Sequence, residues 1–164
     1  MDADQGVFAV SRLSQRFAVP RPSERRLLAL PARQMALVRE VVLSLDEQPV
    51  VFARSVFPMA SLDGELRHLR QLQNRSLGAI LFSHPRMRRA PFELARIDGN
   101  NAYLPPPLKQ AKPAWGRRSC FDLGGKRLMV SEVFLENFRP WPDILPVHRS
   151  QRGRVVTAIS HQSQ

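Results

Sequence analysis

The sequence predicts a single α+β domain whose main element is a mostly antiparallel sheet. Two stretches rich in β-branched and aromatic residues, 34–45 and 49–57, lie in the first half of the chain, and the clearest hairpin, 115–134, lies near its end. Between them, residues 61–72 carry apolar side chains at helical spacing. Strands first, helices in the middle and a closing hairpin are typical of the α+β class.

The chain is expected to begin with a strand and a short helix. Residues 7–17 alternate loosely between apolar and polar side chains, which predicts a strand. A turn follows at 20–24, and there Ser23 has the side chain expected of an N-cap. The helix that it begins is predicted to run to Leu30 and to stop at Pro31.

The two early β-rich stretches are predicted to pair as a hairpin that turns between Asp46 and Pro49. With a two-residue loop, Val41 faces Arg54, and Arg39 lies on the same face one diagonal step away. A three-residue loop would slip the register by one position and place Arg54 on the other face.

The middle of the chain is predicted to be mainly helical. Residues 61–72 have leucines at helical spacing, and 74–82 predicts a second, short helix. Residues 91–97 predict a strand. Residues 98–114 contain Gly-Asn-Asn and three consecutive prolines, which predicts a loop or flexible insertion, because proline cannot pair within a sheet.

The closing hairpin is predicted to turn at Gly124-Gly125. Its register would pair Leu123 with Lys126, Phe121 with Leu128, Ser119 with Val130, and Arg117 with Glu132. Beyond Phe138 the apolar pattern disappears. We therefore expect one domain over residues 1–138 and a basic, disordered tail over 139–164.

Three charged residues stand in apolar strand patterns: Arg39, Arg54 and Glu132. Side chains alternate between the two faces of a strand, so each of them shares its face with aliphatic or aromatic neighbours. A charge turned into such surroundings is costly unless it is paired. Together the three predict a closed pocket that holds a small anion.

Composition limits the compartment. The single cysteine, Cys120, excludes an internal disulfide and fits a reducing compartment. The start of the chain lacks the basic and apolar regions of a secretory signal. No apolar run approaches the ~18 residues of a membrane span. We expect a cytoplasmic protein with no membrane insertion.

The charge balance limits the partners. The formal charge of +11, from 25 Lys and Arg against 14 Asp and Glu, attracts anions. Nucleic-acid surfaces interleave aromatic and basic residues, whereas here most phenylalanines lie in apolar strand patterns. The four histidines show no metal-ligand spacing with Cys120. The expected partner is a small anionic metabolite, with no nucleic acid and no metal.

Five short segments carry a further signal in their order and spacing. They are Leu37–Leu43, Ala53–Pro58, Arg75–Phe82, Trp115–Ser119 and Leu128–Leu135. Over residues 7–138 the chain resembles the chorismate lyase (chorismate pyruvate-lyase) family. The resemblance implies a mostly antiparallel sheet with helices covering one face and an internal ligand cavity. It also implies a carbon–oxygen lyase that eliminates pyruvate from chorismate to give 4-hydroxybenzoate for ubiquinone biosynthesis, and we expect it to be a monomer.

The resemblance also implies roles for four residues. Arg39 matches the arginine that grips the ring carboxylate of the ligand, and Leu77 matches a position whose backbone contacts the same group. Glu132 matches the glutamate at the hydroxyl end of the ring, and Arg54 matches a second inward arginine near the cavity. Only Leu77 is implied by the resemblance alone, because strand alternation selects the other three.

The expected chemistry needs no cofactor. Chorismate becomes aromatic when it loses its side chain as pyruvate together with a ring proton, so no metal, redox cofactor or covalent nucleophile is required. Glu132 is expected either to help the ether oxygen leave as a proton donor or to anchor the 4-hydroxyl. Two alternatives stay open. Glu132 could simply pair with Arg117 across the hairpin, or the domain could be a non-catalytic small-molecule effector-binding module of the same fold.

Overall fold

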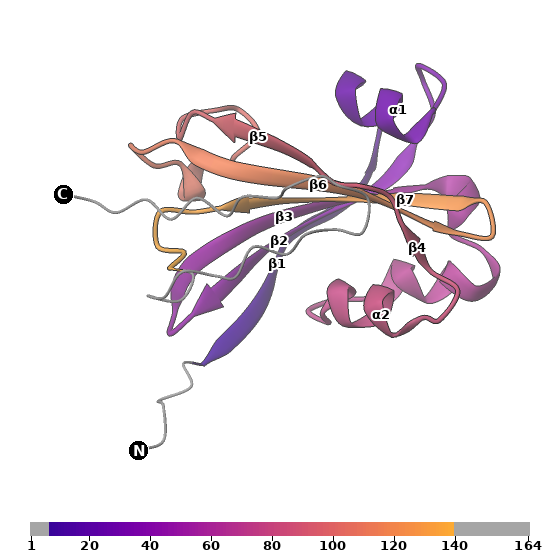
Figure 1. Cartoon of the computed structure of the whole chain (residues 1–164), viewed down its shortest axis with the longest axis horizontal. Coiled ribbons are helices and arrows are strands. Elements are labelled where there is room, and N and C mark those ends of the chain that lie inside the picture. The colour runs from indigo at the N-terminus through magenta and orange to yellow at the C-terminus, as the bar shows by residue number, and fades with distance from the viewer. Residues whose placement is uncertain (1–6, 140–164) are drawn as a thin grey trace, which may run out of the picture.

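The computed structural model describes residues 7–139, which form a seven-stranded antiparallel sheet with helical segments packed on it (Figure 1). The strands are β1 (Phe8–Ala18), β2 (Ala36–Leu45), β3 (Gln48–Pro58), β4 (Arg88–Arg89), β5 (Glu93–Ile97), β6 (Ala114–Leu123) and β7 (Lys126–Phe134). The helices are α1 (Pro22–Leu28) and α2 (Leu77–Ser83), with 3₁₀ segments η1 (Met59–Ser61), η2 (Gly64–Gln71) and η3 (Pro106–Leu108).

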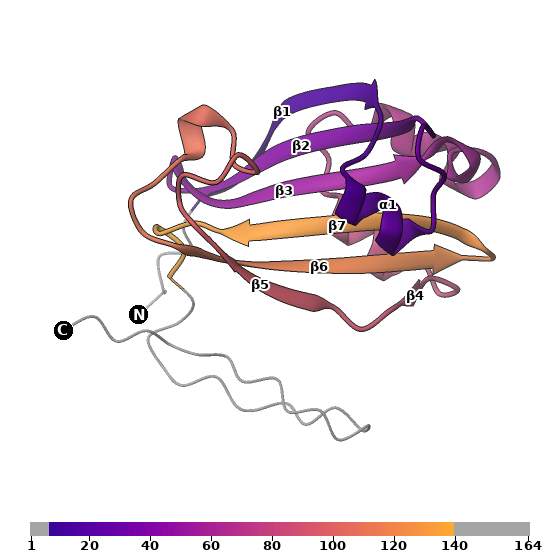
Figure 2. The same ribbon diagram turned by 90° about the horizontal axis from the view of Figure 1, so that it is seen from above.

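The spatial order of the strands is β1-β2-β3-β7-β6-β4, and β5 pairs with another part of β6 (Figure 2). The closing hairpin β6–β7 therefore inserts beside β3, in the interior of the sheet. The segments η1, η2 and α2 cover one face, which we call the pocket face because it also carries the cavity described below. Helix α1 lies over the opposite face, which we call the α1 face (Figure 1). The predicted α+β class with a mostly antiparallel sheet is confirmed, and the structure adds α1 on the second face.

The β6–β7 hairpin has the predicted register. Gly124 and Gly125 form its turn with φ values of 58° and 86°, a conformation that glycine adopts without steric cost. All four predicted cross-strand pairs are present, including Arg117 opposite Glu132 and Ser119 opposite Val130. Because side chains alternate, Arg117, Ser119 and Glu132 all lie on the pocket face.

The β2–β3 hairpin differs from its prediction by one residue. Asp46 and Glu47 form the turn, both at positive φ (49° and 66°), as type I′ turns require. Ser44 then pairs with Pro49, but Leu43 pairs with Val51, so Val50 is the extra residue of a β-bulge.

The bulge changes the face on which Arg54 lies. Val41 pairs with Ala53, and Arg54 pairs with Glu40 instead of facing Val41. A shift of one residue moves a side chain to the other side of the sheet. The prediction that Arg54 shares the pocket face with Arg39 is therefore wrong, and Arg54 lies on the α1 face.

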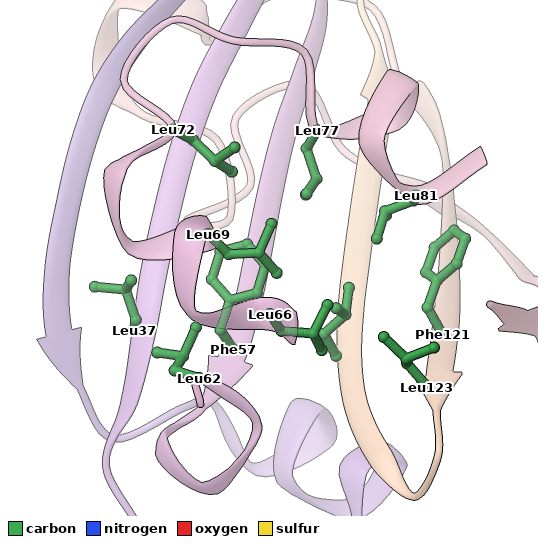
Figure 3. Packing of buried hydrophobic residues seen from close by; sticks show 11 residues of the cluster. Leu37, Phe57, Leu62, Leu66, Leu69, Leu72, Leu77, Leu81, Phe121 and Leu123 are labelled. Carbon is green, nitrogen blue, oxygen red and sulfur yellow. The ribbon is translucent and has the colours of Figure 1, made fainter. Parts of the chain in front are cut away.

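The main core lies between the pocket face and the segments that cover it. Leu62, Leu66, Leu69 and Leu72 are at most 1% exposed and point toward the sheet, where Phe57 meets them (Figure 3). The predicted helix over 61–72 is present as η1 and η2, in 3₁₀ rather than α geometry. A 3₁₀ helix has three residues per turn, so a spacing of three leaves the last three leucines on one side.

A second core covers the α1 face. The loop between β5 and β6 was predicted to be a flexible insertion, but Leu104 and Leu108 from it are buried against Phe52 and Val133. Its prolines keep it out of the sheet, as expected. Helix α1 begins at Pro22, one residue before the predicted cap at Ser23, and packs Leu28 against the same face. Proline is well suited to the first helical position.

Two remaining predictions concern the C-terminal tail and membrane insertion. The predicted basic tail, 139–164, lies outside the described residues apart from Arg139. Within residues 7–139, no helix combines the length and apolar character needed to span a membrane.

Candidate active site

A cavity of about 180 Å³ lies between the pocket face of the sheet and the segment that leads into α2. Its volume is below the ~300–1,000 Å³ of sites for drug-sized ligands, which suits a small metabolite. Among residues 7–139, four arginines line it, Arg39, Arg75, Arg89 and Arg117, but only one carboxylate, Glu132. The remaining lining is mainly apolar, with three serines. The cavity is therefore strongly electropositive and favours an anion.

Arg39 is the most deeply buried of these charges. It lies in β2 and is 2% exposed. Its Nη2 donates hydrogen bonds to the backbone carbonyls of Gln73 and Arg75, both at 2.9 Å, and its Nε is buried without an acceptor. Among the described residues, no carboxylate lies within ion-pair distance of Arg39. Burial, with a smaller contribution from Arg12, lowers the pKa of Arg39 below its usual value.

A buried guanidinium with only carbonyl partners is an unusual state for a folded protein. Arginine remains charged even when it is buried, and an unpaired buried charge destabilises the fold. An anionic ligand in the cavity would supply the missing counter-charge. A carboxylate fits best, since the guanidinium can donate two parallel hydrogen bonds to it.

Glu132 lies in β7 and forms an ion pair with Arg117 of β6, from Arg117 Nε to Glu132 Oε2. The cross-strand ion pair between Glu132 and Arg117, one of the two alternatives, is therefore present in the structure. The pair lies in the wall of the cavity, however, and its side chains remain 25% and 37% exposed. A ligand in the cavity can therefore reach the carboxylate while Arg117 holds it in place.

Leu77 is the first residue of α2 and lines the cavity. Ser76 caps the helix by accepting a hydrogen bond from the Ala79 N–H at 3.4 Å. The Leu77 side chain is 6% exposed and belongs to the main core (Figure 3). Its backbone lies in the first helical turn, where N–H groups have no partner within the helix. Both the core role and a backbone contact to a ligand are compatible with this position.

Arg54 belongs to a different cluster, on the α1 face. Its Nε and Nη2 donate to the two carboxylate oxygens of Glu24 at 2.7 and 3.1 Å, and its Nη1 donates to Glu40 at 2.8 Å. These hydrogen bonds outweigh burial and raise the pKa of Arg54 above its usual value. With two carboxylates already bound and the sheet between it and the cavity, Arg54 has no path to a ligand there.

The structure thus brings Arg39, Leu77 and Glu132 to one cavity and leaves out Arg54. The cavity is also lined by polar residues that the sequence did not single out, among them Arg89 and Ser119. The hairpin register already placed Ser119 on the face of Glu132, so alternation could have found it. Arg89 lies in a basic run, 84–89, of the kind that is usually a solvated surface, and only its pairing with β6 brings it to the cavity.

Comparisons with known proteins agree with the motifs. The family model described as chorismate lyase matches residues 1–141. A protein from Aromatoleum aromaticum named "Probable chorismate pyruvate-lyase" is 42% identical over 142 residues, which cover 83% of this chain and 77% of that protein. A protein of the same name from Azoarcus sp. is 44% identical over 152 residues, with 84% and 77% covered.

Two solved structures that share the fold carry other names. The C-terminal domain of PhnF superposes with a TM-score of 0.64 at 10% identity, covering 82% of this chain and 86% of that one. A transcriptional regulator of the GntR family from Bacillus cereus superposes with a TM-score of 0.60 at 7% identity, covering 85% and 99%. At such identities the likeness shows the fold alone. The sequence matches decide the family, and the chain belongs to the chorismate lyase family, a family of carbon–oxygen lyases.

Proposed function

We propose that this protein eliminates pyruvate from chorismate and releases 4-hydroxybenzoate. The observation that carries the proposal is Arg39, a buried guanidinium that faces the cavity with no carboxylate partner among the described residues. Membership of the family supplies the reaction. The proposal is supported by a small cavity in which arginines outnumber carboxylates among the lining residues, with Glu132 in the same wall.

The reaction needs a substrate held in one orientation. It also needs a proton to leave the ring and a proton to reach the departing enolpyruvate. The bond between ring carbon 3 and the ether oxygen breaks, ring carbon 4 loses its proton, and the ring becomes aromatic. The departing enolpyruvate takes up a proton and becomes pyruvate. Binding energy at the carboxylates would hold chorismate in the reactive geometry, and this part of catalysis requires no reactive side chain.

The three residues gathered at the cavity have separate tasks in this proposal. Arg39 binds the ring carboxylate through its guanidinium, and the Leu77 backbone N–H assists it. Glu132 lies toward the hydroxyl end of the ring. There it either donates a proton to the leaving ether oxygen or accepts a hydrogen bond from the 4-hydroxyl. The two roles differ in the effect of an amide substitution, which is developed in the Discussion.

The biological setting belongs to the same proposal. By its resemblance to the family, we infer that the product enters ubiquinone biosynthesis in the cytoplasm and that a monomer without a cofactor carries out the reaction.

The test is to mix the purified protein with chorismate and follow 4-hydroxybenzoate by ultraviolet absorbance. We expect product with the wild type and a large loss with Arg39→Met. Chorismate that binds, as measured by calorimetry, but is not converted would contradict the lyase and favour the effector-binding module. The fold shared with GntR-family regulators makes that module the second candidate.

A further inference from the structure

Arg89 lines the cavity from the pocket face, as Arg39 does, but from a strand near the other edge of the sheet. It lies in the short strand β4, which pairs with β6 at Phe121. Arg39 in β2 is four strand spacings away, about 19 Å between backbones. Both side chains nevertheless line the same cavity. The cavity therefore has a guanidinium at each end.

The Arg89 guanidinium is held in place without being neutralised. Its Nε and Nη2 donate to the Ser119 hydroxyl at 3.3 and 3.0 Å. Three phenyl rings surround it, Phe82, Phe92 and Phe121, with centroids 5.5, 5.9 and 5.6 Å from its central carbon. Among residues 7–139, no carboxylate lies within ion-pair distance of it. Serine and aromatic rings orient a guanidinium but leave its charge available.

The other arginines of the cavity are less suited to a second anion. Arg117 already binds Glu132, so that pair contributes no net charge. Arg75 and Arg89 are both exposed, but the Arg75 carbonyl accepts a hydrogen bond from Arg39, which places the Arg75 backbone at the Arg39 end. Arg89 is thus the remaining oriented and unpaired cation at the end away from Arg39. Ser119, which is 3% exposed, has no acceptor for its own hydroxyl proton among the described residues and can donate it to the same anion.

We propose that Arg89, together with the Ser119 hydroxyl, binds the second carboxylate of the substrate, the one carried by the enolpyruvyl side chain. This inference rests on the proposed function and replaces the role that the sequence suggested for Arg54. One cavity then holds two carboxylates on two separate guanidinium groups, with the scissile ether between them and Glu132 in the adjacent wall.

With Arg89 in this role, the substrate and the aromatic product differ in the contacts that they make with the cavity. Chorismate carries both carboxylates, whereas 4-hydroxybenzoate carries only the ring carboxylate. The product therefore loses the Arg89 contact when the ether bond breaks, and pyruvate keeps it. Arg89 should contribute to the recognition of chorismate and pyruvate but not to that of 4-hydroxybenzoate, whereas Arg39 should contribute to both aromatic ligands.

The experiment compares Arg89→Gln with Arg88→Gln, a matched control in the same strand that does not line the cavity. Three quantities are measured for each variant: kcat/KM for chorismate, the inhibition constant of 4-hydroxybenzoate, and the inhibition constant of pyruvate. Arg89→Gln should lower kcat/KM about ten- to a hundredfold, the usual effect of losing a charge-assisted hydrogen bond to a ligand. It should weaken pyruvate inhibition similarly and change 4-hydroxybenzoate inhibition by less than about threefold.

Arg89→Lys and Arg75→Gln sharpen the result. Lysine keeps the charge but not the planar fork, so Arg89→Lys should recover part of the lost kcat/KM. If Arg89→Gln behaves like Arg88→Gln while the wild type converts chorismate, only the assignment of Arg89 is wrong. The same holds if Arg75→Gln, and not Arg89→Gln, shows the selective loss. If the wild type does not convert chorismate, the proposed function and this inference both fail.

Discussion

Two buried arginines on opposite faces of the same hairpin should respond differently to the same substitution. Arg39 and Arg54 are 2% and 4% exposed. Arg54 binds two carboxylates, Glu24 and Glu40, whereas Arg39 binds only backbone carbonyls. We therefore expect Arg54→Met to reduce stability and Arg39→Met to reduce activity.

The expected magnitudes follow from the partners left behind. Arg54→Met leaves Glu24, with a side chain that is 1% exposed, as a buried carboxylate without its partner. Breaking such a pair from one side costs about 3–5 kcal/mol, or about 6–20 °C in Tm for a domain of this size. Arg39→Met leaves two carbonyls of exposed residues that can turn to water, and it removes an unpaired charge. The free energy of unfolding should then change by less than about 1 kcal/mol.

The measurement is urea unfolding at pH 7 followed by circular dichroism, together with turnover of chorismate. Arg39→Met should lower kcat/KM about a hundredfold or more at nearly unchanged stability. The reasoning is refuted if the two variants lose similar stability, because Arg39 would then be a structural residue. It is also refuted if Arg54→Met unfolds like the wild type, because Glu24 and Glu40 would then be satisfied in another way.

Two further predictions concern carboxylates. Glu132→Gln should reduce kcat about 10²–10⁴-fold if Glu132 is the proton donor, whereas an amide that still accepts a hydrogen bond from the 4-hydroxyl should preserve most of kcat if it is only an anchor. The control is Glu93→Gln, which removes the partner of Arg118 in an exposed cross-strand pair and should leave kcat unchanged. Wild-type turnover in Glu132→Gln would exclude the proton role. Burial raises the pKa of Glu40, but hydrogen bonds from Ser14 and Arg54 outweigh it and leave this pKa below the ordinary 4.5. The stability that Glu40 contributes is thus fully present above pH 4.5 and is lost as the pH falls through the lowered pKa of Glu40. Below pH 4.5, the free energy of unfolding should therefore fall less steeply with pH in Glu40→Gln than in the wild type. Equal slopes would contradict this.

The family likeness also explains why fold alone was a weak guide to function. The same fold occurs in a GntR-family transcriptional regulator at 7% identity, so the architecture does not distinguish a lyase from an effector-binding domain. What distinguishes them here is the sequence match to the chorismate lyase family and the charged groups in the cavity. The Glu132 and Arg39 variants test those groups directly.

Local sequence determined the parts of the site that depend on one turn. The Gly124-Gly125 turn sets the β6–β7 register, because both glycines have the positive φ of a two-residue turn and no bulge interrupts the pairing that follows. Once that register is known, alternation places Arg117, Ser119 and Glu132 on one face. Arg39 could likewise be recognised as a charge within an apolar strand pattern.

Tertiary contacts decided the rest. Val50 is the extra residue of the β2–β3 bulge, and its carbonyl accepts a hydrogen bond from Leu135, more than eighty positions later in the chain. The β2–β3 turn does not specify that contact, and the bulge at Val50 puts Arg54 on the α1 face instead of in the cavity. Arg89 reaches the cavity only because two residues of β4 pair with β6. Alternation along a strand can be seen in sequence, but which strand face meets the cavity depends on long-range pairing, and a one-residue change in that pairing exchanges the faces.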